Sequence, residues 1–311
     1  MNTRPTGAAH VIEAPPLGLA TDQRSASTRQ LLSDYVELTK PKVQSLLLLT
    51  TIATMYVAGD PSPLLVALTC LGGYLSAGGA GAVNHWYDRD IDARMARTAT
   101  RPVPSGRVSP GAALAFGCTL AALSFLELSL TVNVLAASLS FAGFLGYVFL
   151  YTIWLKRRTP QNIVIGGAAG AIPPLVGWAA VTGSVSATAV LLFFIVFFWT
   201  PPHFWALSLL MKDEYAEVGI PMLPVVRGEQ ETRRQILLYS MLLYAVSQLP
   251  FCVGVFGGFY LAASMLLGLA FIAGAVLLYR RADRKTALRL YLFSMLYLAL
   301  LFVTMVLDAK L

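Results

Sequence analysis

Nine long apolar segments constrain what this chain can fold into, because each is close to the length of a membrane-crossing helix. A helix needs about 17–25 mostly apolar residues to cross the hydrocarbon core of a bilayer. Hydrophobic residues make up 57% of the chain and charged residues only 13%, against about 25% charged in soluble domains. None of the segments shows the short alternating pattern of a transmembrane β-barrel. We therefore predict an all-α polytopic membrane protein with nine transmembrane helices, at 43–59, 64–83, 111–131, 133–152, 162–180, 186–206, 236–256, 259–279 and 289–307.

The positive charges predict the orientation of these spans. Every Lys and Arg except Lys310 lies before the first span or in the loops that follow spans two, four, six and eight. Loops rich in Lys and Arg stay on the cytoplasmic side of a membrane. The N-terminus and these loops are therefore expected to be cytoplasmic. The net charge of +7 then reflects topology, and no nucleic-acid partner is expected.

Residues 1–30 differ in composition from the remainder. They are rich in Ala, Pro, Thr and Ser and contain no apolar core, so they do not form a secretory signal. Glu13 and Asp22 argue against a mitochondrial transit peptide, which avoids acidic residues. We expect 1–30 to be a disordered cytoplasmic tail and 31–311 to be the transmembrane domain.

A dense polar cluster follows the second apolar segment. Asn84, Asp88 and Asp92 recur every four residues, which places them on one face of a helix. Two carboxylates and an amide oxygen suit a hard divalent cation such as Mg2+, which often shares its ligands with substrate phosphates. Guanidinium groups, which bind phosphate oxygens well, crowd the same segment at Arg89, Arg94, Arg97 and Arg101. The cluster therefore predicts a diphosphate site at the membrane edge, the alternative being solvated surface ion pairs.

A second polar cluster follows the sixth segment. Asp213 and Glu217 are four residues apart, and Lys212 and Glu214 lie beside them. Both clusters follow an even-numbered span, so both are expected on the same side of the membrane. Two facing carboxylate clusters could hold two or more Mg2+ ions with a diphosphate between them. Metal-bound phosphate oxygens would stabilise the negative charge of a departing diphosphate.

Two histidines allow a functional or a structural interpretation. His203, near the cytoplasmic end of the sixth span, could contact a polar substrate, act as an acid or base, or ligate a metal centre. It could equally be a helix-end histidine bonded to the backbone. His85 directly follows Asn84 and is a packing residue or a substrate contact.

Small residues and prolines also allow predictions about the helices. The small-residue runs 72–82 and 166–171 indicate close helix packing, or room for a lipid tail or a flat ring. We expect helices to break or kink at Pro173, Pro174, Pro201 and Pro202.

The first cluster also resembles a known family. Asn84-x3-Asp88-x-Asp90-x-Asp92-x2-Met95-x-Arg97-Thr98-x2-Arg101-Pro102 resembles the first aspartate-rich motif of the UbiA superfamily of intramembrane prenyltransferases. Its MxRTxxRP continuation is similar to the branch that farnesylates protohaem. The blocks TPPHFWAL at 200–207 and GIPMLPVV at 219–226 resemble the same branch. One departure is Glu214, since the family commonly has Asp immediately before the tyrosine that is Tyr215 here.

The resemblance implies a UbiA-type bundle and a specific reaction. Farnesyl diphosphate would lie on Mg2+ held by the first cluster and by Asp213 or Glu214, and an allylic cation would be attacked by a vinyl group of haem b (protohaem IX). Water would complete the hydroxyethylfarnesyl side chain. Haem is then a substrate rather than a cofactor, and His203 is the expected contact on its side. The expected catalytic or metal-binding residues are Asn84, Asp88, Asp92, His203, Asp213, Glu214 and Glu217; the expected substrate-binding residues are His85, Arg89, Arg97, Arg101, Lys212 and Tyr215.

Location and partners follow from the same resemblance. We expect a multi-pass protein of a bacterial inner membrane, with its site at the cytoplasmic face and a downstream haem-modifying membrane enzyme as a partner. The alternatives are a UbiA-type enzyme acting on a quinone precursor or a chlorin ring, or a multi-span transporter. A transporter tends to place ionisable residues near the bilayer centre, whereas the acids here cluster at one membrane face.

Overall fold

Helices form almost all of the computed structural model, which describes residues 28–311. No strand occurs among these residues. In chain order, the helices are α1 (Thr28–Leu38), α2 (Pro41–Ala58), α3 (Pro63–Tyr87), α4 (Arg89–Asp92), α5 (Pro110–Thr131), α6 (Val134–Leu145), the π-helix η1 (Gly146–Leu155), α7 (Asn162–Gly170), α8 (Pro173–Thr182), α9 (Ala187–Leu210), α10 (Lys212–Glu217), α11 (Leu223–Val226), α12 (Gly228–Cys252), α13 (Gly258–Arg281) and α14 (Arg284–Asp308). The tail predicted at 1–30 lies, apart from its last three residues, outside the described part of the chain.

Helices occupy all nine predicted spans, and this confirms the all-α membrane class. Eight helical segments of the described chain are long and apolar enough to cross a membrane, counting α6 with η1 and α7 with α8 as one segment each. The remaining predicted span coincides with α2, which has only 18 residues and begins with the polar Lys42 and Gln44. The count of nine transmembrane helices is therefore not confirmed.

The sequence specifies where several of these helices begin. Ser62 and Ser109 each precede a proline, and their Oγ atoms accept hydrogen bonds from the backbone N–H groups of Leu65 and Ala112, both at 3.2 Å. A serine N-cap satisfies one unpaired N–H of the first turn. Proline fits the first helical position because no N–H is needed there. The Ser-Pro pairs thus start α3 and α5.

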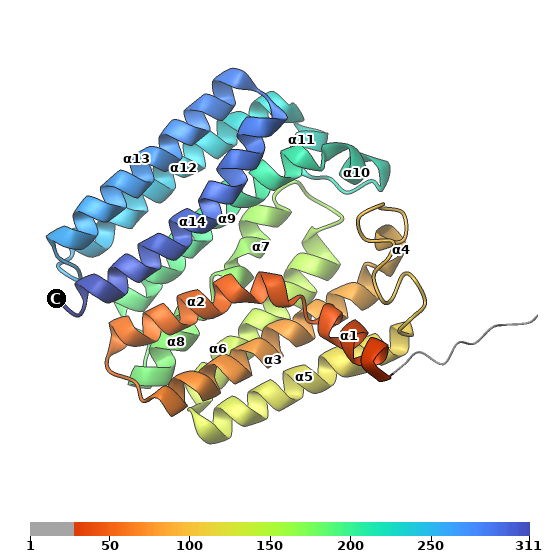
Figure 1. Cartoon of the computed structure of the whole chain (residues 1–311), viewed down its shortest axis with the longest axis horizontal. Helices are drawn as coiled ribbons and strands as arrows, with labels where there is room; N and C mark the ends of the chain where they lie inside the picture. Colours follow the sequence, from red (N-terminus) through yellow and green to blue (C-terminus); the bar gives the residue numbers. More distant parts are fainter. Residues whose placement is uncertain (1–27) are drawn as a thin grey trace, which may run out of the picture.

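The long helices form a closed bundle (Figure 1). Along the chain α3 packs on α5, α5 on α6, α12 on α13 and α13 on α14. The ring closes through α2, which packs on both α8 and α14. The short helices α4, α10 and α11 and the helix α1 lie toward the same end, and the C-terminus lies at the other (Figure 1). Consequently both predicted polar clusters meet at one end of the bundle, as expected.

Small residues allow the closest helix contacts. A Cβ atom on Gly79 would lie 2.7 Å from the backbone oxygen of Gly117, so α3 and α5 touch backbone to backbone there. A Cβ atom on Gly167 would lie 2.8 Å from the side chain of Thr200. Close packing through small residues is typical of membrane helices. The structure therefore supports the packing interpretation of the runs 72–82 and 166–171.

The prolines behave in two ways. Pro173 follows the break between α7 and α8, as predicted. In contrast, α9 continues through Pro201 and Pro202 to Leu210, so the helix does not break there, and a kink at these prolines stays a prediction.

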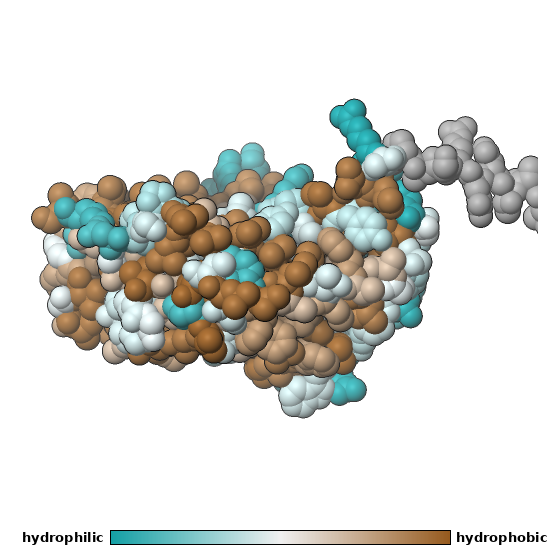
Figure 2. All heavy atoms as spheres, turned by 90° about the horizontal axis from the view of Figure 1, so that it is seen from below, coloured by the Kyte–Doolittle hydropathy of each residue, from teal (hydrophilic) through white to brown (hydrophobic). Residues whose placement is uncertain are grey.

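The outside of the bundle is largely apolar. Figure 2 shows one side of the molecule, where brown hydrophobic side chains cover most of the surface between scattered polar patches. Exposed side chains such as Leu126, Phe149 and Leu266 would be unfavourable in water over so wide an area. This surface is suited to contact lipid.

Candidate active site

The first polar cluster lies where α3 ends. Asp88 caps α3, and its backbone N–H bonds the carbonyl oxygen of Asn84 at 2.9 Å. The N–H of Asp92 in turn bonds the carbonyl oxygen of Asp88 at 2.8 Å. Helical spacing therefore continues from α3 into α4. Asn84, Asp88 and Asp92 are buried, with exposed fractions of 4%, 0% and 3%, which argues against solvated surface pairs.

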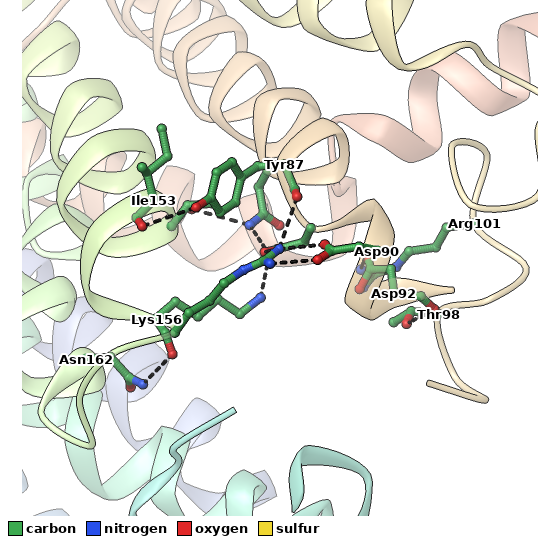
Figure 3. A network of polar contacts seen from close by, with 12 residues as sticks. Tyr87, Asp90, Asp92, Thr98, Arg101, Ile153, Lys156 and Asn162 are labelled. Atoms are coloured by element: carbon green, nitrogen blue, oxygen red, sulfur yellow. Dashed lines mark hydrogen bonds and ion pairs between the residues drawn. The ribbon is translucent and has the colours of Figure 1, made fainter. Parts of the chain in front are cut away.

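Each of these three side chains contacts a basic group from another segment. The Oδ1 atom of Asn84 accepts a hydrogen bond from Lys40 Nζ at 2.5 Å, and its Nδ2 donates to Asp88 Oδ2 at 2.7 Å. Asp88 Oδ2 also accepts from Lys156 Nζ at 2.5 Å. Asp92 Oδ2 accepts from Arg101 Nη1 at 2.7 Å. Figure 3 shows the part of this network that contains Asp92, Arg101 and Lys156.

Arg157 supports the network from its outer side. Its guanidinium binds both carboxylate oxygens of Asp90, at 2.7 and 2.6 Å, and reaches Asp88 Oδ1 at 3.3 Å. It also lies 4.7 Å from the ring centre of Tyr87, a cation–π distance. The hydrogen bonds from Arg157 hold the pKa of Asp90 below its usual range. Arg157 is therefore held in place by several partners at once.

The sequence analysis did not assign Lys40, Thr152, Lys156 or Arg157 to the site. Lys40 follows α1 with a left-handed backbone (φ 55), and burial, followed by repulsion from Arg101 and Lys156, lowers its pKa to about 7. The π-helix η1 ends immediately before Lys156 and presents Thr152 Oγ1 at 3.3 Å from Asn84 Nδ2. Lys40 is separated from Asn84 by 44 residues and Lys156 from Asp88 by 68. In the sequence, Lys156 and Arg157 stand out only as positive charges at the end of an apolar run, a pattern that predicts topology rather than a place in the site.

The second cluster lies on α10 and meets the first through Arg94. The Nη2 atom of Arg94 donates to the backbone oxygen of Glu217 at 2.7 Å. The side chain of Glu217 is exposed. Tyr215 is partly buried and packs against the main core together with Tyr151 of η1. The loop that carries the first cluster thus touches α10, as predicted.

The structure separates Asp213 from Glu214. Glu214 Oε2 is buried and has no hydrogen-bond partner among the described residues. Asp213 instead lines an outer pocket of about 210 Å3 with Lys212 and Glu229, and Lys212 Nζ binds Glu229 Oε1 at 3.1 Å. Lys212 is therefore paired on the α12 side, away from the first cluster. Of the two acids, Glu214 is the better candidate for the site.

The remaining predicted arginines differ in their contacts. Arg89 Nη1 donates to the backbone oxygen of Trp86 at 2.6 Å, and Arg97 is exposed to solvent. Of the predicted substrate-binding arginines, Arg101 alone binds a residue of the Asn84, Asp88 and Asp92 set in the described structure.

The two histidines have different environments. His203 is 7% exposed, and its ring stacks on Trp199 and Tyr291, with ring centres 4.3 and 4.9 Å away. Its Nδ1 lies 2.6 Å from Ser294 Oγ, which favours an orienting or packing role. His85 is 1% exposed, and both of its ring nitrogens lack a hydrogen-bond partner among the described residues. The two ring nitrogens of His85 therefore remain able to form hydrogen bonds beside the first cluster.

The oxygen-bearing side chains of the site are chemically suited to a hard cation. Buried carboxylates at Asp88 and Asp92, the amide oxygen of Asn84 and the unpartnered Glu214 Oε2 are all oxygen ligands, which Mg2+ prefers. Among the described residues no three His, Cys, Asp or Glu side chains already converge on one point. The carboxylates of the first cluster are engaged by Lys156, Arg157 and Arg101 instead.

Comparisons with known proteins agree with this geometry. Residues 47–301 match the UbiA prenyltransferase family. The "Protoheme IX farnesyltransferase" of Symbiobacterium thermophilum is 56% identical over 283 residues, which cover 90% of this chain and 95% of that protein. The proteins of the same name from Roseiflexus sp. and Chloroflexus aurantiacus are 55% and 52% identical. The chain spans about half the length of these two relatives, 52% in each case.

Solved structures share the fold at low sequence identity. A structure described as digeranylgeranylglyceryl phosphate synthase superposes with a TM-score of 0.75 at 22% identity, covering 90% of this chain and 99% of that one. A UbiA homologue from Archaeoglobus fulgidus bound to DMAPP and Mg2+ superposes with a TM-score of 0.65 at 16% identity, covering 88% and 99%. These likenesses show the fold. Together with the family match and the close relatives, they establish that the chain belongs to the UbiA prenyltransferase family.

Proposed function

We propose that this protein transfers a farnesyl group from farnesyl diphosphate to a vinyl group of protohaem IX, with release of diphosphate and addition of water, giving haem O. The observation that carries the proposal is the buried Asn84, Asp88 and Asp92 set, in contact with Lys40, Lys156 and Arg101. A buried set of oxygen ligands beside basic groups is suited to a metal-bound diphosphate. The choice of protohaem as the acceptor is supported by the names of the close relatives and by the MxRTxxRP and TPPHFWAL blocks.

The metal ligands in this proposal are Asn84, Asp88, Asp92 and Glu214. Mg2+, when bound, would screen the diphosphate charge and make the diphosphate a better leaving group. Asp88 and Asp92 are buried, so their charges act at low local dielectric, where electrostatic effects are larger than in water. Removal of the metal with EDTA should therefore abolish turnover.

The basic residues around the set would bind the diphosphate oxygens. Lys40, Arg101 and Lys156 each hold a donor within 2.7 Å of a ligand oxygen, and a small movement would direct these donors at phosphate. Preorganised donors of this kind stabilise charge that develops on the leaving group. The expected effect is faster ionisation of the allylic C–O bond.

Aromatic side chains would face the resulting cation. Tyr147 lies on η1, with its ring centre 6.0 Å from Lys40 Nζ, and Tyr151 lies 5.4 Å from Tyr147 between ring centres. Aromatic faces attract cations. The apolar bundle would bury the prenyl chain, which gains roughly 0.8 kcal/mol per CH2, and would keep water away until the vinyl group reacts.

The positive loops support a site at the cytoplasmic face. Arg94, Arg101, Lys156 and Arg157 all belong to the end of the bundle that bears α4 and α10. By the positive-inside rule this end faces the cytoplasm. We place the protein in a bacterial inner membrane, with a haem-modifying membrane enzyme as the recipient of its product.

Product analysis tests the proposal. Purified protein incubated with farnesyl diphosphate, haem b and Mg2+ should yield a haem with longer chromatographic retention. Asp88→Asn should yield none while still inserting in the membrane. If no new haem forms while a quinone precursor becomes prenylated, the acceptor assignment is wrong and the protein is a UbiA enzyme of another branch.

A further inference from the structure

Every side chain of the Asn84, Asp88 and Asp92 set is already occupied by a basic group. Lys40 comes from the α1–α2 junction, Lys156 from the end of η1 and the third, Arg101, from the loop after α4. Each donor lies within 2.7 Å of its acceptor oxygen, so each basic group is in direct hydrogen-bond contact with the set. Three separate parts of the chain therefore converge on the oxygens that would bind a metal.

A divalent cation would bind these oxygens only weakly while the basic groups remain in place. Two cations that shared one carboxylate oxygen would repel each other strongly at low local dielectric. Moving Lys156 away without a new partner would leave a partly buried ammonium unpaired, since its side chain is only 14% exposed, and such a charge is costly. Diphosphate removes this cost because its oxygens give the displaced groups new partners.

The contacts also indicate which groups can move. Within the described residues, Lys156 Nζ donates a hydrogen bond to Asp88 alone, and it sits at the end of a flexible four-carbon chain. Arg157 is held by Asp90, by the backbone oxygen of Tyr87 and by the Tyr87 ring. Arg157 can therefore remain as the fixed partner of Asp88 when Lys156 leaves. Asp88 thus keeps one cation and releases the other.

We propose that Lys40, Arg101 and Lys156 are exchange cations: they hold the ligand oxygens in the empty site and move to the diphosphate when metal and diphosphate arrive together. The metal alone then binds weakly, and the basic groups become diphosphate ligands only in the loaded site. This inference rests on the proposed function, because it requires a diphosphate substrate. It adds that removal of one of these side chains should strengthen the binding of free metal and weaken the binding of metal diphosphate.

Binding of Mn2+, followed by electron paramagnetic resonance, tests the exchange without turnover. Lys156→Met should tighten Mn2+ binding by about 10-fold, equivalent to 1.4 kcal/mol, because Asp88 Oδ2 loses its competing ammonium group. The same variant should weaken binding of pyrophosphate in saturating Mg2+ by a similar factor, because a phosphate donor is lost. Lys40→Met provides an independent arm with the same two signs, in case Lys156→Met fails to fold.

Arg89→Met is the matched control for the long-range electrostatic effect of removing one positive charge near the metal ligands. Arg89 carries the same charge and adjoins Asp88, yet it donates to the backbone oxygen of Trp86. If Arg89→Met tightens Mn2+ binding as much as Lys156→Met, the effect is long-range electrostatics and the exchange is refuted. Wild-type protein that binds Mn2+ alone as tightly as Lys156→Met also refutes it, while the proposed function stands. If the wild type binds neither Mn2+ nor pyrophosphate with Mg2+, the proposed function itself fails.

Discussion

Breaking and then neutralising the Asp88–Lys156 pair gives a quantitative test of the site. Asp88 is fully buried; its Oδ2 accepts from Lys156 and Asn84, and its Oδ1 from Arg157. Asp88→Asn leaves one acceptor oxygen and turns an NH2 group toward these donors. Removing one member of a buried pair costs about 3–5 kcal/mol. We expect the lower value, about 3 kcal/mol, because Lys156 and Arg157 are 14% and 29% exposed and water screens them in part.

The assay is thermal unfolding of purified protein in detergent, with turnover measured in parallel. A loss of about 3 kcal/mol should lower the melting temperature by roughly 6–12 °C. Lys156→Met should cost less, because Arg157 still contacts Asp88 at 3.3 Å. The double variant removes both charges and should be more stable than Asp88→Asn alone, although it remains inactive. Lys42→Met, at an exposed position of α2, is the control and should melt like the wild type. Losses that simply add in the double variant would show that the two groups are not coupled, and would refute the pair.

Three further predictions concern other residues of the site. Glu214→Gln should reduce kcat by about 100-fold or more, as expected for a group that stabilises transition-state charge. Asp213→Asn should change kcat little because Asp213 lines the outer pocket, and equal losses of kcat in the two variants would contradict the assignment of Glu214. Because the pKa of Lys40 is lowered to about 7, Lys40 loses its charge as the pH rises through that value, so KM for farnesyl diphosphate should increase above pH 7. This increase should be absent in Lys40→Met, and a pH profile of KM that is unchanged in that variant would exclude Lys40 as its source. His203→Asn removes the ring stacked between two aromatic residues and should destabilise the protein by about 2 kcal/mol without altering Mn2+ binding, and a loss of Mn2+ binding would instead place His203 in the metal site.

Local patterns were enough to predict the helices and the first cluster. The apolar segments predicted the bundle, since a span needs a continuous apolar run of set length, and the four-residue spacing predicted that Asn84, Asp88 and Asp92 share one helix face. Tertiary packing decided the rest. Lys40 and Lys156 reach the cluster from 44 and 68 residues away, and no periodicity relates them to it.

The second cluster shows more clearly what could not be predicted from the sequence. Asp213 and Glu214 are neighbours, so the sequence offers equal chemistry for both. On the short helix α10, adjacent side chains point about 100° apart, and the packing of α10 against α9 and α11 decides which one faces inward. Local propensity likewise did not predict that α9 continues through Pro201 and Pro202, because proline disfavours a helix interior.

Acceptor competition tests the central claim most directly. Purified protein would receive labelled farnesyl diphosphate and Mg2+ together with equal amounts of haem b and the quinone precursor para-hydroxybenzoate. We expect the label to appear in haem and to be absent from para-hydroxybenzoate, and we expect Asp88→Asn or EDTA to abolish the transfer. Label in para-hydroxybenzoate with haem b unchanged would contradict the proposed function.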